Sequence, residues 1–443
     1  MVKPSLRSSP KTTLPVNAHP NAVANIEAER PSMQNTVHPV RVLYSFPHRL
    51  GAARICHTAW QQVNGLLAAG ARVAVFPGSL QREVAEGADV KQTLAYGKLR
   101  IPYRVLGTER ACALHDWVVS RRLERLKGEI DIVHAWPLGS LRTLKTARRL
   151  GIPTVLERPN AHTRFAYEVV QKECEKLGVF LPPDHEHAYK PSVLAKEEAE
   201  YEAAFRLLCP SDFVVRTFVD QGFATEKLTR DQYGYDETVY FPGQQARDDQ
   251  SGLQVLFVGG CAPRKGLHYA LEAWLRSPAS RKGKFTIAGA FVPGYAERLS
   301  SMLADPSIEV LGHRHDVPEL MRKSDLLILP SIEEGSALVT SEARASGCVL
   351  VVSEAAGAIC MHMENALVHR AGDVDELTAH LTLLDSDRDL LERLRAASLR
   401  TTDEITWKAA GRKLLSAYQQ VMAEYRESAV TSQKNSPISF AHS

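Results

Sequence analysis

Short apolar segments alternate with amphipathic ones, and this alternation most constrains what the chain can form. The predicted strands of the first half include VRVLYSF (40–46), ARVAVFPG (71–78), DIVHAWP (131–137) and IPTVLERP (152–159). The same rhythm restarts after residue 252 with LQVLFVGG, KFTIAGA, IEVLG, LLILPS and CVLVVSEAAG. Continuous runs of Val, Ile and Leu that alternate with helices indicate parallel sheets covered on both faces.

The rhythm and the length divide the chain into two α/β units. At 443 residues it is too long for one hydrophobic core, and each unit has the size of a Rossmann-like domain. The polar stretch YFPGQQARDDQSG, rich in breakers, is the predicted linker. The predicted segments are a tail (1–39), a first domain (40–239), the linker (240–252), a second domain (253–406), a closing helix (407–426) and a second tail (427–443).

Two local features of the first half are also predicted. The stretch PSVLAKEEAEYEAAFRLL (191–208) reads as one long helix at the end of this half. Ser211 is expected to cap the next helix, which runs to Gly222.

Bulk properties exclude several classes of protein. A formal net charge of +3 is too small to indicate nucleic-acid binding, and no run approaches the ~18 to 20 apolar residues of a membrane helix. Seven scattered cysteines without a CxxC pair, and an N-terminus without a secretory apolar core, predict a cytoplasmic protein. The basic runs at 121–127 and 145–150 are interpreted as solvated helix faces, with contact to an anionic membrane surface as the alternative.

The second half opens with a basic, glycine-rich loop. In VLFVGGCAPRKGLHYALEAW a strand runs into Gly259 and Gly260, and Arg264 and Lys265 come just before a helix. Glycines allow close backbone approach, and a helix N-terminus and a lysine attract anions. The stretch matches neither GxGxxG nor the P-loop pattern. By itself it fits an anion site and an ordinary turn equally well.

An acidic loop follows a later strand, in LPSIEEGSALVTSEARASG (329–347). Glu334 and Glu342 are eight positions apart, roughly 12 Å along a helix at about 1.5 Å per residue. This separation is wrong for carboxylates that share a proton, but it suits an elongated ligand. Glu333, Glu334 and the amides of residues 335–338 are expected at the carboxyl edge of the sheet. The structural alternative is that Glu334 complements the helix dipole and Glu342 faces solvent.

Both loops point to the same edge, and together they describe a nucleotide-sugar site. The second half resembles the donor-binding domain of retaining glycosyltransferases of family 4 (glycosyl transferases group 1). The resemblance rests on Glu334-GSALVTS-Glu342, which has the E-x7-E form, and on FVGGCAPRKG, LGHRHDVPELMRKSDLLILPS and NALVHRAGDVDEL. It is continuous from about 200 to 420 and weaker from 40 to 200. It implies the GT-B fold, an α/β architecture in which two Rossmann-like domains face a cleft.

The resemblance also implies roles for individual residues. Glu334 would meet hydroxyls of the donor sugar, Glu342 the ribose, and Lys265 the diphosphate. Gly260 stands where relatives have an arginine, so Arg264 or a first-domain arginine would supply the missing charge. The implied donor-binding residues are Gly259, Gly260, Arg264, Lys265, His313, Gly335, Ser336, Ala337, Leu338 and Glu342.

The first domain would bind the acceptor. The family often places a histidine after the strand that matches PTVLERPNAHT, where Arg158 stands in register and His162 follows four residues later. With Glu334, these two residues are the catalytic candidates. Gly51 in the first loop and His134 in the third predicted strand, DIVHAWP, are candidates for the cleft.

The implied activity moves a sugar from a UDP- or GDP-linked donor to a hydroxyl of a saccharide or lipid-linked acceptor, with retained configuration, in polysaccharide or glycoconjugate biosynthesis. No cofactor and no metal are expected, because the acidic pairs at Asp373 and Asp385 flank a predicted helix and suit capping. The alternatives are a non-catalytic nucleotide-sugar-binding protein and an epimerase on the same fold.

Overall fold

A computed structural model describes residues 38–96, 99–100, 106–243 and 252–434. The predicted N-terminal tail up to residue 37, residues 244–251 of the predicted linker and residues 435–443 lie outside this range. The described residues form two parallel sheets with helices on both faces, as the alternation of segments predicts.

The first sheet has seven parallel strands in the order β3-β2-β1-β6-β7-β8-β9. A separate antiparallel pair, β4 and β5, follows β3 in the chain. The strands are β1 (Arg41–Leu50), β2 (Arg72–Leu80), β3 (Asp89–Val90), β4 (Ala95–Tyr96), β5 (Leu99–Arg100), β6 (Ile132–Ala135), β7 (Thr154–Glu157), β8 (Arg206–Cys209) and β9 (Leu228–Arg230).

Two apolar clusters cover the faces of this sheet. On one face α1 packs together with α15, where Val63 and Leu66 meet Tyr418 and Val421. Helices α3, α4, α6 and α7 cover the other face. The helices around this sheet are α1 (Ile55–Ala68), α3 (Thr108–Arg125), α4 (Leu141–Leu150), α5 (Thr163–Leu177), α6 (Pro191–Ala203), α7 (Asp212–Asp220) and α15 (Trp407–Lys434).

The second sheet has six parallel strands in the order β12-β11-β10-β13-β14-β15. Its strands are β10 (Gln254–Val258), β11 (Lys284–Ala288), β12 (Ile308–Gly312), β13 (Leu326–Leu329), β14 (Val349–Ser353) and β15 (Ala366–His369). Its helices are α8 (Leu267–Arg276), α9 (Tyr295–Arg298), α10 (Ser300–Leu303), α11 (Val317–Lys323), α12 (Leu338–Ala345), α13 (Val374–Ser386) and α14 (Arg388–Leu399). One large apolar cluster fills both faces.

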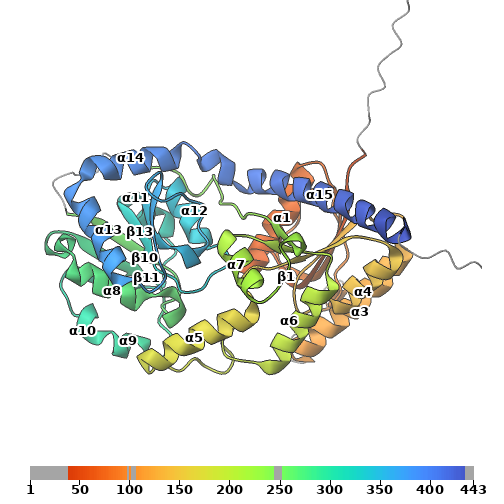
Figure 1. Ribbon diagram of the computed structural model, residues 1–443, viewed down its shortest axis with the longest axis horizontal. Helices are drawn as coiled ribbons and strands as arrows, with labels where there is room; N and C mark the ends of the chain where they lie inside the picture. The colour runs from red at the N-terminus through yellow and green to blue at the C-terminus, as the bar shows by residue number, and fades with distance from the viewer. Residues whose placement is uncertain (1–37, 97–98, 101–105, 244–251, 435–443) are drawn as a thin grey trace, which may run out of the picture. The chain divides into compact units, whose positions relative to one another are not determined.

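The closing helix α15 leaves the second half of the chain and packs on the first sheet (Figure 1). Gly65 of α1 and Gly411 of α15 face each other, and a Cβ on Gly411 would collide with the backbone of Gly65. The two helices therefore approach closely at this pair. The helix continues to Lys434, beyond the predicted end at 426, because neither glycine nor proline interrupts residues 412–434.

One predicted helix is too long. Helix α6 ends at Ala203, and the segment Arg206–Cys209 forms β8 between β7 and β9. Burial of Leu207 and Leu208 inside the sheet overrides the helical pattern of this stretch. The capping prediction is confirmed, because the Ser211 side chain accepts a hydrogen bond from the Val214 amide at the start of α7.

The basic runs lie on exposed faces of α3 and α4. Glu124 pairs there with Arg121 and Arg149, so part of the positive charge is used in surface ion pairs. Among the helices described, none is both long and apolar enough to cross a membrane.

Candidate functional site

The basic loop after β10 and the acidic loop after β13 meet at the carboxyl edge of the second sheet. The Ile332 amide donates a hydrogen bond of 2.9 Å to the Arg264 carbonyl, which joins the two loops directly. Gly266 follows the short 3-10 turn Pro263–Lys265 with a φ of 67°, and a Cβ there would collide with the Pro330 carbonyl. The glycine thus permits the close approach that puts Lys265 beside the acidic loop.

Glu334 binds both cations of the basic loop. Its carboxylate forms an ion pair with the Lys265 ammonium, and its Oε1 lies 3.1 Å from Arg264 Nη1. Burial opposes ionisation of Glu334, but attraction to Arg264 and Lys265 outweighs it and lowers the carboxyl pKa. Burial also lowers the pKa of Lys265, against the attraction of Glu334. The predicted convergence of Arg264, Lys265 and Glu334 is therefore present.

Glu342 occupies a different environment on α12. Its carboxyl group is hydrogen-bonded to Tyr240, the residue at which the predicted linker begins. Burial raises the pKa of Glu342 to about 7, although the hydrogen bond with Tyr240 opposes the shift. Glu342 is half-buried and not a solvent-facing residue of the kind that the structural alternative requires. It is a carboxyl group whose charge depends on pH close to neutrality.

The turn before α12 contacts the first half of the chain. Gly335 packs against the Pro159 carbonyl, and its own carbonyl accepts a hydrogen bond of 2.5 Å from Ser211 Oγ. The Ala337 amide donates to the Ala356 carbonyl at 3.1 Å, so this amide is already used. Ala337 precedes α12 without a side-chain cap from the described residues, while Ser336 and Leu338 stay half-buried.

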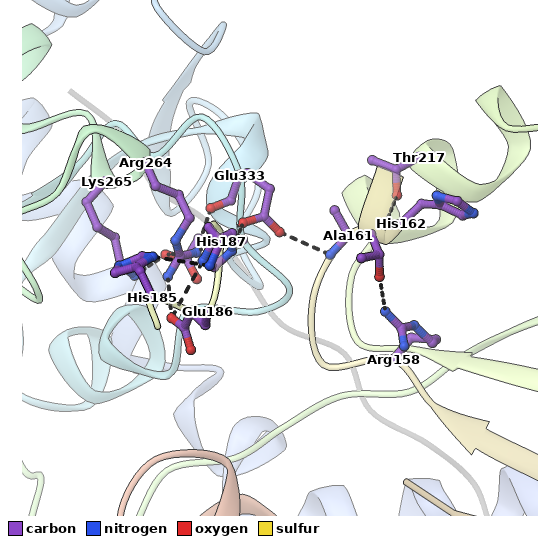
Figure 2. Close-up of polar contacts among 12 residues, drawn as sticks. Arg158, Ala161, His162, His185, Glu186, His187, Thr217, Arg264, Lys265 and Glu333 are labelled. Atoms are coloured by element: carbon purple, nitrogen blue, oxygen red, sulfur yellow. Dashed lines mark hydrogen bonds and ion pairs between the residues drawn. The ribbon is translucent and has the colours of Figure 1, made fainter. Parts of the chain in front are cut away.

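Glu333 was expected at this edge without a role of its own, and its partner His187 was not expected at the site. Glu333 is fully buried, and its Oε2 lies 3.0 Å from Nε2 of His187, which belongs to the segment between α5 and α6. Its Oε1 accepts from the Ala161 amide at 3.2 Å, and Arg264 Nη1 lies 3.2 Å from Oε2 (Figure 2). Burial opposes ionisation, but the hydrogen bond with His187 and the charge of Arg264 lower the pKa of Glu333 to about 2. Two adjacent glutamates were the only sequence signal.

The His162 ring has a structural role. His162 is the N-cap of α5, where its Nδ1 accepts from the Arg164 amide at 3.2 Å. Its ring packs against Tyr201 and Phe218, with centroids 5.2 and 4.9 Å away. Burial lowers its pKa to about 4. Figure 2 shows this ring turned away from the Glu333 carboxylate, so His162 does not approach the acidic loop as its candidate role requires.

Arg158 is buried and already paired. Its guanidinium lies 3.1 Å from Glu197 and is stacked over the Tyr201 ring, 4.4 Å from the ring centroid. It therefore does not replace the charge that Gly260 lacks. It does line a cavity beside Glu186 and His187.

The remaining candidates are spread over both halves of the chain. His134 is fully buried, with Nδ1 2.6 Å from the Tyr418 hydroxyl and Nε2 3.4 Å from Glu157, so it contacts the closing helix. Gly51 adopts a φ of 81° in the turn after β1. His313 is exposed after β12. A Cβ on Gly260 would meet nothing within 4 Å in the described part of the chain.

The acidic pairs near Asp373 and Asp385 belong to helix starts. The Asp373 side chain accepts from the Glu376 amide at the start of α13, as predicted. In the second pair Asp387 is the capping residue, and it accepts from the Leu390 amide at the start of α14. The described residues contain no cluster of three or more His, Cys, Asp or Glu side chains with metal-binding geometry.

Sequence comparisons relate this chain to glycosyltransferases. Residues 252–387 match the family model described as glycosyl transferases group 1. The chain is 24% identical over 340 residues to D-inositol 3-phosphate glycosyltransferase from Frankia alni, which covers 70% of this chain and 79% of that protein.

Solved structures share the fold. Sucrose-phosphate synthase from Thermosynechococcus elongatus aligns with a TM-score of 0.62 at 16% identity, over 87% of this chain and all of that one. Anabaena HepE in complex with UDP aligns with a TM-score of 0.57 at 15% identity, over 86% of this chain and all of that one. The predicted GT-B fold is confirmed. The family match and the relative support a glycosyltransferase function and do not favour the binding-protein or epimerase alternatives.

Proposed function

We propose that this glycosyltransferase moves a sugar from a nucleoside diphosphate to an acceptor hydroxyl with retention of configuration. The observation that carries the proposal is the contact of Lys265 and Arg264 with Glu334, in the loop before α12, the helix that holds Glu342. Two cations, a helix N-terminus and two separate carboxylates match the successive parts of a nucleotide sugar.

Glu334 and a diphosphate would compete for the same two cations. A diphosphate that takes over Lys265 and Arg264 releases the Glu334 carboxylate to accept hydrogen bonds from sugar hydroxyls. Glu342 would accept hydrogen bonds from the ribose hydroxyls. Binding of the donor thereby converts an internal ion-pair cluster into a set of contacts with the ligand.

The reaction breaks the bond between the sugar C1 and the diphosphate oxygen and forms a bond from C1 to the acceptor oxygen. Lys265, Arg264 and the N-terminus of α12 would stabilise the negative charge that develops on the leaving diphosphate. In a front-face mechanism the diphosphate oxygen takes the proton of the acceptor hydroxyl, and Glu334 positions the sugar. The resemblance to retaining enzymes supports this course, for which neither a cofactor nor an essential metal is needed.

Calorimetry with UDP and GDP, in buffer with EDTA, tests the donor site. We expect one nucleotide to bind the native protein and to bind Glu342→Ala more weakly. UDP is the first choice because HepE was solved with UDP. Folded protein that binds neither nucleotide would reject the donor assignment.

Retention is tested with the sugar donor of whichever nucleotide binds. Slow transfer to water releases a free sugar, and proton NMR at early times identifies its first anomer. The anomer present in the donor supports retention, whereas the opposite anomer rejects it.

A further inference from the structure

A cavity of about 200 Å³ lies at the carboxyl edge of the first sheet. Its wall includes Trp136, Arg158, Asn160, Glu186, His187 and Glu197. His187 connects it to the donor site, because the same imidazole contacts Glu333 (Figure 2). The cavity is smaller than the ~300–1,000 Å³ of pockets for drug-sized ligands, so its volume suits one small ring.

Two buried nitrogens in this wall have no hydrogen-bond partner among the described residues. They are Nδ1 of His187 and Nε of Arg158, on residues that are only 7% and 2% exposed. Buried polar atoms are paired in most proteins, and unpaired ones require an explanation. A polar ligand in the cavity would supply the missing partner to both side chains.

Glu333 determines which nitrogen of the His187 ring carries the proton. An ionised carboxylate only accepts hydrogen bonds, so the His187 Nε2 that lies 3.0 Å from Glu333 carries the proton. Whenever the imidazole is neutral, the other nitrogen, Nδ1, is then an acceptor. The Glu186 carboxylate lies 3.7 Å from Nδ1 and is also an acceptor. Two neighbouring acceptors suit two adjacent hydroxyl groups.

The charges of the wall do not favour a phosphorylated ligand. Arg158 is the one arginine or lysine among the residues that line the cavity, and Glu197 neutralises it at 3.1 Å. His48 also lines the cavity, and burial lowers its pKa to about 4, which leaves it uncharged at neutral pH. Glu186 adds a negative charge. A phosphate group would therefore enter a neutral to acidic space.

We propose that this cavity binds an uncharged polyhydroxylated ring of the acceptor and that His187 Nδ1 accepts a hydrogen bond from one of its hydroxyls. The inference rests on the proposed function, because it places the acceptor beside the donor loops. His187 then contacts the substrate, and Glu333 acts through it as a positioning residue. The ring could come from a saccharide or a cyclitol, which share this chemistry.

The test uses the full chain labelled with 15N-histidine and saturated with the nucleotide found by calorimetry. Methyl α-D-glucopyranoside, myo-inositol and myo-inositol 1-phosphate are titrated separately, and the Nδ1 resonance of His187 is followed. We expect one of the two uncharged rings to shift this resonance and to bind at least about fivefold more tightly than the phosphate ester. The ring that binds identifies the source.

Three variants give the matched comparison. His187→Gln keeps an N–H donor for Glu333 but has no acceptor at the Nδ1 position, whereas His187→Asn keeps an acceptor near that position. Binding of the ring, measured by calorimetry, should weaken about fivefold to tenfold in His187→Gln and less in His187→Asn. Phe180→Ala, an 86% exposed position of the same segment, should bind like the native chain.

Each contrary result has a distinct meaning. Preference for the phosphate ester would overturn the uncharged class, and the absence of any shift at His187 with all three probes would overturn the pocket. Equal ring binding by His187→Gln and the native chain would overturn the role of Nδ1. Nucleotide binding is measured in the same samples, so failure of the proposed donor site is recognised separately.

Discussion

Gly335 packs against the carbonyl oxygen of Pro159 so closely that the space has no room for a Cβ. The contact joins the acidic loop of the second sheet to the loop after β7, and the hydrogen bond from Ser211 to the Gly335 carbonyl strengthens it. The acidic loop and the loop after β7 therefore meet through a glycine backbone, which explains why a small residue follows Glu334.

Gly335→Ala should destabilise the protein and reduce transfer. The added methyl group has to displace Pro159 or the loop itself, at a cost of about 1–3 kcal/mol, typical of overpacking. Thermal and urea unfolding measure this cost, and donor hydrolysis measures the activity. Gly260→Ala is the stability control, because its Cβ enters open space in the described structure and should change stability by less than about 0.5 kcal/mol. Equal unfolding of the two variants would contradict the steric argument.

Lys265→Met should weaken nucleotide diphosphate binding about 10- to 150-fold, the effect of removing a hydrogen bond with a charged partner. The variant keeps the length of the side chain and leaves Arg264 to hold Glu334. Calorimetry is carried out with the diphosphate and with the matching nucleoside. The nucleoside lacks the phosphates, so its affinity should change little, and the loss of affinity for the diphosphate is then assigned to the phosphate contact. Lys282→Met, at an exposed lysine in the turn before β11, is the control.

Glu342 should make nucleotide binding depend on pH. Its pKa in the folded protein is about 7, above its ordinary value, so the carboxyl group is protonated below pH 7 and ionised above it. Ribose hydroxyls donate to the ionised form, and the affinity should therefore fall about tenfold from pH 8 to pH 6 through this group. Residue 342 does not titrate in Glu342→Gln. Subtracting the pH profile of its nucleotide affinity from that of the native chain therefore cancels the titration of the nucleotide itself. Parallel pH profiles would contradict the ribose role.

The raised pKa of Glu342 also affects the stability of the fold, and here low pH is the favourable condition. The folded state holds the Glu342 proton more tightly than the unfolded chain, so this group contributes stability at low pH. That contribution is lost as the pH rises from the ordinary carboxyl range through about 7. Urea unfolding of the native chain and Glu342→Gln at pH 5 and pH 8 should show the variant gaining relative stability at pH 8.

The convergence of Lys265 and Glu334 was predictable because both loops follow strands of one parallel sheet, whose carboxyl ends share an edge. The contact of Glu333 with His187 was not, since it joins residues 146 positions apart through a segment without a regular pattern. His162 shows a different limit. Alignment with the family gives the position of His162 in the chain but not the direction of its side chain. That direction is set by its role as the cap of α5 and by packing against the Tyr201 ring.

Tyr418→Phe should destabilise the attachment of the closing helix to the first sheet. The Tyr418 hydroxyl lies 2.6 Å from His134 Nδ1, and both side chains are fully buried. Removing the hydroxyl leaves the imidazole nitrogen without its partner, at a cost of about 1–3 kcal/mol. Urea unfolding measures this change, with Tyr425→Phe as the control at a half-buried tyrosine of the same helix. Because His134 contacts Glu157 and Tyr418, the variant should leave nucleotide affinity unchanged. A loss of affinity without a loss of stability would instead return His134 to the cleft, where the sequence had placed it.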